Sequence, residues 1–119
     1  EANKIPNILK SILNDINIDY NAIFVNWYKN GSEYISAHSD DEKDIIENSE
    51  ITSLSFGETR TFRIRSKEDK NNKIDFELKH GSLFIMGGKF QKEFTHEVPK
   101  TKKNNERRIN LTLRNMKIL

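Results

Sequence analysis

The sequence contains no cysteine and no long hydrophobic run, and each absence excludes a class of protein. Without cysteine the chain forms no disulfide and no thiolate zinc site, which suits a reducing compartment. No apolar stretch approaches the roughly 20 residues that a membrane-spanning helix needs. We therefore expect an intracellular protein, in the nucleus or the cytoplasm, that has no membrane partner.

Charges of both signs are nearly balanced in number, but they are unevenly distributed. The 119 residues include 20 Lys or Arg and 18 Asp or Glu, a formal net charge of +2. Residues 89–119 hold nine basic and three acidic side chains, whereas residues 1–88 are net acidic. A basic C-terminal third fits contact with a polyanion such as nucleic acid, but from charge alone a solvated lysine-rich surface is the simpler interpretation.

The hydrophobic pattern predicts one helix followed only by strands. Apolar residues repeat at helical spacing over residues 6–15, where we expect an amphipathic helix that covers a sheet. Short β-type segments bounded by turn residues follow at 22–28, 34–38, 50–56, 59–65, 73–79, 82–86, 94–98 and 107–115. Eight strands without intervening helices predict a mainly β sandwich or jelly roll, built as a single domain over residues 1–119. We expect the apolar strand residues Leu54, Phe56, Phe62, Leu83 and Ile85 to line its interior.

Two histidines and one aspartate have the residue types and spacing of a metal site. His38 and Asp40 lie two apart on a predicted strand end, so their side chains point to the same face. His96 lies on another short strand and supplies a third ligand, completing the two-histidine, one-carboxylate set of non-haem Fe(II) oxygenases. A surface hydrogen bond between His38 and Asp40 is the alternative. We expect the remaining histidine, His80, to make a structural hydrogen bond beside Gly81.

The last strand carries one polar face that is unusual for a core strand. Four of its residues share that face: Arg108, Asn110, Thr112 and Arg114. Burying arginine is costly unless the guanidinium finds an anion, and a dicarboxylate would meet that need through forked hydrogen bonds. On the first strand, Asn26 and Tyr28 share a face and can join the same site. An exposed polar edge strand is the alternative.

Six motifs in this order resemble the AlkB family of Fe(II)/2-oxoglutarate dioxygenases, and most closely its members that repair alkylated DNA and RNA. They read NWYKNG, HSDDE, SLSFGETRTFRIR, HGSLFIMGG, H-x-VPK and RINLTLR, from about residue 21 to the C-terminus. The resemblance implies a double-stranded β-helix, or jelly roll, with an N-terminal supporting helix.

The resemblance also implies a role for each candidate residue. It implies that Fe(II) is held by His38, Asp40 and His96. It implies that 2-oxoglutarate is bound by Asn26, Tyr28, Arg108, Asn110, Thr112 and Arg114, with Arg108 on the distal carboxylate. For the substrate it implies Glu42, then Asp41, reading the edge of a flipped base, and Arg60 facing the substrate.

The activity implied is oxidative demethylation of N-alkylated bases such as 1-methyladenine and 3-methylcytosine in DNA or RNA. Fe(II), 2-oxoglutarate and O₂ would be required, with ascorbate as the reductant in vitro. Two alternatives stay open: an enzyme of the same mechanism that hydroxylates or demethylates protein, and a catalytically weak nucleic-acid-binding module on the same jelly roll.

The sequence departs from nucleic-acid-repairing relatives in one respect. Those relatives carry upstream segments that form a lid over the base, whereas only 21 residues precede the first predicted strand here. We therefore expect a catalytic domain that is truncated at the N-terminus and favours single-stranded nucleic acid, because extruding a base from a duplex costs a few kcal/mol. Trp27 and the basic loop 99–108 could supply stacking and phosphate contacts, but we expect Trp27 to pack in the core.

Overall fold

The computed structural model describes residues 7, 11, 14–15, 20–103 and 106–118. The helix expected over residues 6–15 lies for the most part outside the described residues. In the described part, no helix is long and apolar enough to cross a membrane.

Eight strands and one short helix make up the described fold. The strands are β1 (Ala22–Tyr28), β2 (Ile35–His38), β3 (Ile51–Gly57), β4 (Arg60–Ser66), β5 (Lys73–Leu78), β6 (Leu83–Met86), β7 (Phe94–Val98) and β8 (Arg108–Arg114). Each predicted strand is confirmed, and each end lies within one residue of its expected position. The helix α2 (Phe90–Glu93) was not expected from the sequence.

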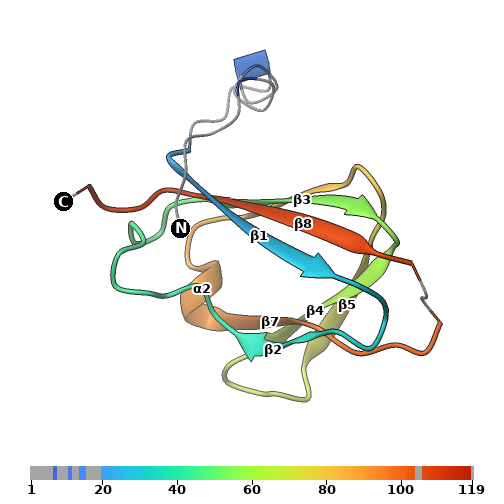
Figure 1. The fold of residues 1–119 in the computed structure, drawn as a ribbon. Coiled ribbons are helices and arrows are strands. Elements are labelled where there is room, and N and C mark those ends of the chain that lie inside the picture. Colours follow the sequence, from blue (N-terminus) through green and yellow to red (C-terminus); the bar gives the residue numbers. More distant parts are fainter. Residues whose placement is uncertain (1–6, 8–10, 12–13, 16–19, 104–105, 119) are drawn as a thin grey trace.

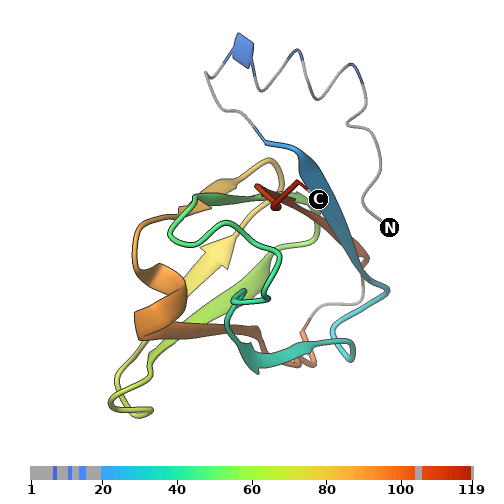
Figure 2. The same cartoon turned by 90° about the vertical axis from the view of Figure 1, so that its left-hand side faces the viewer.

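The strands form two antiparallel four-stranded sheets that face each other, as the jelly-roll prediction requires. The major sheet has the order β1-β8-β3-β6, and the minor sheet has the order β2-β7-β4-β5 (Figure 1). Figure 2 shows α2 at one end of the two layers, where it connects β6 of the major sheet to β7 of the minor sheet. The expected fold class is therefore confirmed.

The space between the sheets is apolar on one side and polar on the other. The buried core contains Tyr28, Ile51, Phe62, Leu78, Met86 and Val98. The register of the major sheet places Asn26 opposite Asn110 and Tyr28 opposite Arg108, so these polar side chains share the inner face. Polar groups on β1 and β8 thus occupy part of the inner face of the major sheet, where an ordinary sandwich has apolar ones.

The outer face of the major sheet carries the apolar residues that alternate with this polar row. Four of the five residues expected to line the interior were wrongly placed, because Leu54, Phe56, Leu83 and Ile85 point outward and only Phe62 is buried inside. Trp27 faces away from Asn26 and Tyr28 as expected, but its packing in a core is contradicted by an exposed fraction of 60%. The predicted alternation of side chains along each strand was correct, but on β3 and β6 the residues expected to face inward in fact face outward.

Candidate metal centre and adjoining cavities

Three side chains from separate parts of the chain meet between the sheets. His38 ends β2 and His96 lies in the middle of β7, and the two are direct partners in the antiparallel pair. Their ring centroids lie 4.3 Å apart. Asp40 follows β2 and places its carboxylate 3.5 Å from His38 Nε2 and 3.4 Å from His96 Nε2. One ligand atom from each residue falls within 4.8 Å of the other two, which is close enough to share one metal ion.

The hydrogen bonds around the three residues prepare them to bind a cation. Burial raises the pKa of Asp40, but hydrogen bonds from His38 and His96 and the charge of Arg114 outweigh it and hold that pKa well below its ordinary value. His38 Nδ1 lies 2.8 Å from the Ser36 carbonyl oxygen, to which it can donate. In a neutral His38 this bond places the ring proton on Nδ1 and leaves the Nε2 lone pair free for a metal ion.

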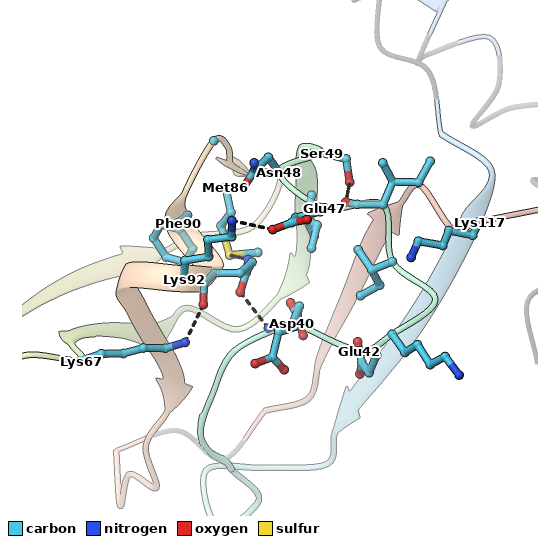
Figure 3. Close-up of a pocket in the computed structure, with 17 residues that line it drawn as sticks. Asp40, Glu42, Glu47, Asn48, Ser49, Lys67, Met86, Phe90, Lys92 and Lys117 are labelled. Atoms are coloured by element: carbon cyan, nitrogen blue, oxygen red, sulfur yellow. Dashed lines mark hydrogen bonds and ion pairs between the residues drawn. The ribbon is translucent and has the colours of Figure 1, made fainter.

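The backbone of Asp40 is fixed by α2. The Asp40 N–H donates to Oε1 of Gln91 at 2.7 Å, and the Ser39 hydroxyl donates to the Phe94 carbonyl at 2.7 Å. Figure 3 shows Asp40 beside α2, with a dashed line that joins its backbone to the helix. Sequence analysis missed Gln91, because its segment follows two glycines and showed no periodicity that indicated a helix.

A cavity of about 290 Å³ lies next to the three residues, between the two sheets. Its lining includes the metal candidates together with every expected co-substrate residue: Asn26, Tyr28, Arg108, Asn110, Thr112 and Arg114. The structure therefore brings the two predicted sites together in one enclosure. Ser53 also lines it, and accepts a hydrogen bond from the amide nitrogen of Asn110.

Arg108 is the strongest indication of what this cavity holds. Its side chain is 2% exposed, and Nη2 donates to the Ser55 hydroxyl at 2.9 Å. Its Nε and Nη1 atoms are buried without a partner in the described part of the chain. Burial also lowers the pKa of Arg108, which shows that the cation is poorly compensated. An anion in the cavity would supply the missing acceptors.

Ser53 and Ser55 are separated by one residue in the S-L-S segment. This spacing could have predicted that both side chains share the inward face.

Arg114 links the metal candidates to the acidic loop that follows them. Its Nη2 lies 3.3 Å from Asp40 Oδ1, and its Nη1 lies 3.5 Å from Glu42 Oε2. Its guanidinium also stacks over the Phe24 ring at 4.3 Å. Glu42 and Asp41 are both exposed, and Glu42 lines the rim of the cavity while Asp41 does not. Of the two expected substrate-reading acids, the geometry favours Glu42.

A second hollow of about 430 Å³ lies on the other side of Asp40, against α2. Figure 3 shows its apolar base, formed in part by Met86 and Phe90, and its charged rim, which includes Lys67, Lys92 and Lys117. Lys92 pairs with Glu47 at 2.5 Å across this rim. Asp40, Glu42 and Met86 line both hollows, so Asp40 lies between the two, whereas His38 and His96 line only the cavity between the sheets.

Two further expected residues lie away from this centre. His80 accepts a hydrogen bond from the Gly57 N–H at 2.9 Å, which confirms the expected structural role. Arg60 is buried, and its guanidinium donates to backbone carbonyls instead of opening onto a surface. The substrate contact expected for Arg60 is therefore not supported by its position.

The residues present fit Fe(II) and 2-oxoglutarate. Two imidazole nitrogens and one carboxylate are the donor set of Fe(II) oxygenases, and they leave adjacent coordination positions free. The unpartnered guanidinium atoms of Arg108 in the same cavity fit the far carboxylate of a dicarboxylate. The three metal-ligating side chains fit Fe(II), and the unpartnered nitrogens of Arg108 fit the carboxylate of 2-oxoglutarate.

Comparison with known proteins gives the same family. The family model described as "2OG-Fe(II) oxygenase superfamily" matches residues 1–114. The chain is similar to the rat alpha-ketoglutarate-dependent dioxygenase alkB homolog 3, with 39% identity over 103 residues that cover 80% of this chain and 35% of the relative. It is also similar to the DNA oxidative demethylase ALKBH2 of Arabidopsis thaliana, with 35% identity over 117 residues that cover 80% of this chain and 37% of the relative.

The chain spans between about a third and two fifths of the length of the curated relatives that it matches. Among solved structures, OsALKBH1 matches with a TM-score of 0.75 and 22% identity, covering 93% of this chain and 64% of the other, which supports the fold. These findings confirm the resemblance to AlkB proteins noted from the sequence. The chain belongs to the 2OG-Fe(II) oxygenase superfamily, and its curated relatives are AlkB homologues.

Proposed function

We propose that this chain is an Fe(II)/2-oxoglutarate-dependent dioxygenase domain that demethylates N-alkylated bases in DNA or RNA. The observation that carries the proposal is the placement of His38, Asp40 and His96 in the same cavity as Arg108, two of whose guanidinium nitrogens have no partner in the described part of the chain. The similarity to AlkB homologues, one of them named a DNA oxidative demethylase, supports nucleic acid as the substrate. The family match over residues 1–114 supports one catalytic domain.

The metal would be held by Nε2 of His38, the Asp40 carboxylate and His96. With 2-oxoglutarate and O₂, Fe(II) bound there supplies the oxidant that hydroxylates an N-methyl carbon, and the resulting hemiaminal releases formaldehyde. The ionised state of Asp40 suits this role, because its depressed pKa keeps the carboxylate charged at neutral pH. The coordinating nitrogen of each histidine must carry a free lone pair. For His38, the bond from Nδ1 to the Ser36 carbonyl selects the tautomer that leaves Nε2 free.

The co-substrate residues act by position and charge. Arg108 would take the distal carboxylate of 2-oxoglutarate in a forked bond, with Tyr28 opposite it on β1 and Asn26 one pair further along, opposite Asn110. Thr112 donates to the Asn110 amide oxygen at 3.0 Å and so fixes the side chain of Asn110 within the cavity. Arg114 would lie beside the metal-proximal end. Phe62, Met86 and Val98 line the apolar side and limit the entry of water, which would otherwise consume the oxidant.

The substrate base would approach from the exposed side of His38 and Glu42. A base methylated at N1 of adenine or N3 of cytosine carries a positive charge, so a carboxylate at this rim stabilises it. Glu42 is held toward the cavity by Arg114, which pairs with it and with Asp40. The exposed basic residues of loop 99–108 fit contacts to phosphates. We propose single-stranded nucleic acid as the preferred form.

The test uses oligonucleotides that carry one 1-methyladenine or 3-methylcytosine, incubated with the protein, Fe(II), ascorbate and 2-oxoglutarate. We expect loss of one methyl group by mass spectrometry, with formaldehyde and succinate formed in equal amounts. His38→Ala removes a metal ligand and is expected to abolish turnover. Succinate formed only with a peptide substrate, or binding of oligonucleotides with no succinate under any condition, would contradict the proposal and favour the two alternatives respectively.

A further inference from the structure

Arg60 is one of the most deeply buried charged residues of the described chain, and no role in the metal or co-substrate site accounts for it. It begins β4, and its side chain is 2% exposed. Burying a guanidinium costs several kcal/mol unless hydrogen bonds compensate, so its position requires an explanation. The cavity that holds the metal candidates is not lined by Arg60. Any effect on that cavity must pass through a neighbour.

The acceptors of Arg60 come from two loops rather than from one. Its Nη1 donates to the Asn30 carbonyl at 3.2 Å, and its Nη2 donates to the Glu33 carbonyl at 2.8 Å and the Pro99 carbonyl at 2.9 Å. Asn30 and Glu33 lie between β1 and β2, and Pro99 follows β7. The Thr101 N–H donates to the Gly31 carbonyl at 2.8 Å, which joins the same two loops. Arg60 therefore ties together the loops at one end of the two sheets.

The same end of the two sheets also contains Tyr28 and Arg108, the part of the proposed co-substrate site that would bind the distal carboxylate. Tyr28 is the last residue of β1 and Arg108 the first residue of β8, and they are paired across the strands. The guanidinium carbons of Arg60 and Arg108 each lie 5.3 Å from the centroid of the Tyr28 ring. Within the part of the chain that the structure describes, no carboxylate lies within ion-pair distance of either arginine. Two buried cations thus approach the same phenol ring.

We propose that Arg60 is a positioning residue that makes the co-substrate site selective for a 2-oxo acid with a second carboxylate. It packs against the Tyr28 ring, which Arg108 also contacts, and holds the adjoining loops together at this end. It also adds a second buried positive charge near the ring, so that a distal carboxylate is favoured over an apolar chain end. This inference rests on the proposed function, because it assumes that Arg108 binds the distal carboxylate of 2-oxoglutarate.

The test compares two ligands that differ only at the distal end. 2-Oxoglutarate ends in a carboxylate, and 2-oxopentanoate has the same carbon chain with a terminal methyl group. Binding of each is measured by calorimetry on protein loaded with Mn(II), which avoids turnover. For Arg60→Gln we expect 2-oxoglutarate to bind about tenfold more weakly, the effect of about 1.4 kcal/mol, while 2-oxopentanoate changes less than about twofold. The expected result is therefore a loss of selectivity, which a general defect in folding would not produce.

Two further variants complete the design. Arg60→Lys keeps the charge and most of the buried stem but cannot donate to three carbonyls as a planar fork, so we expect a smaller loss of selectivity. Arg63→Gln is the matched control, because Arg63 lies on the same strand and pairs with Asp75 outside the cavity at 2.8 Å. Thermal unfolding of each variant confirms that it is folded before binding is measured, and Arg60→Lys serves if Arg60→Gln does not fold.

The outcomes separate this inference from the proposed function. If the wild-type protein binds neither acid, the proposed function fails. If the wild type prefers 2-oxoglutarate and both Arg60 variants keep that preference, or lose affinity equally for both acids, the inference is wrong and the proposed function stands.

Discussion

At the scale of single residues, the candidate site contains two buried charged groups, one well compensated by its neighbours and one not. Asp40 is surrounded by His38, His96 and Arg114, which favour its ionised form. Arg108 has the opposite condition, because two of its nitrogens are buried without an acceptor in the described part of the chain. A metal ion satisfies the first group and a carboxylate satisfies the second. The unpartnered nitrogens of Arg108 are costly for folding alone, and a bound anion would explain them.

Arg108→Ala tests the second of these groups. Removing a buried, charged hydrogen-bond donor is expected to cost about 1.5–3 kcal/mol of co-substrate binding, or roughly a ten- to hundredfold rise in the KM for 2-oxoglutarate. The measurement is succinate formation at varied 2-oxoglutarate. An unchanged KM would show that another residue, with Arg114 and Arg107 the nearest candidates in the sequence, binds the carboxylate.

The raised pKa of Tyr28 predicts that the free energy of unfolding falls at alkaline pH. Burial raises its pKa above the ordinary value of 10.0, although the charges of Arg108 and Arg60 oppose that rise. Because the folded-state pKa is higher than that of the unfolded chain, the contribution to stability is complete below the unfolded pKa and is lost as pH rises toward the folded one. Tyr28→Phe should therefore lose less stability than the wild type between about pH 9.5 and 11, measured by denaturant unfolding. Equal losses in the two proteins would contradict this assignment.

At the scale of elements, the positions of the strands could be predicted from the sequence, but which face of β3 and β6 points into the molecule could not. Alternation and turn residues were enough to predict all eight strands, and the shared face of Arg108 and Asn110 follows from the same period of two. The inward face of β3 and β6 was wrongly assigned because apolar residues were expected inside. On β3 the polar Ser53 and Ser55 face inward instead, whereas β6 is apolar on both faces and turns Phe84 and Met86 inward. The helix α2 spans only four residues, too few to show helical periodicity.

Gln91 on α2 gives a test of how an element positions a ligand. Gln91→Ala removes the acceptor that holds the Asp40 N–H at 2.7 Å. Supporting groups of this kind typically change metal affinity by tenfold or more, so we expect about a tenfold weaker binding of Mn(II) by calorimetry. Lys92→Ala is the matched control on the same helix, since its exposed pair with Glu47 contributes little to stability and lies away from the metal ligands. Equal affinities for the wild type and Gln91→Ala would show that α2 does not position Asp40.

At the scale of the whole molecule, the fold brings distant residues to one point by pairing strands from both halves of the chain. β2 and β7 place His38 against His96, and β1 and β8 place Tyr28 against Arg108. The residues that the sequence motifs predicted for the metal and the co-substrate line one cavity, whereas Asp41 and Arg60, predicted for the substrate, do not. The second hollow and the hydrogen bond from the Asp40 N–H to Gln91 could not be predicted, because both depend on how the loop around Asp40 packs against α2.

The most direct test of the account is anomalous diffraction from crystals grown without oxygen in the presence of Fe(II) and 2-oxoglutarate. We predict one strong iron peak within bonding distance of His38 Nε2, the Asp40 carboxylate and His96, with the distal carboxylate of 2-oxoglutarate against Arg108. An iron peak bound by other residues, or no peak between these three side chains, would contradict the account.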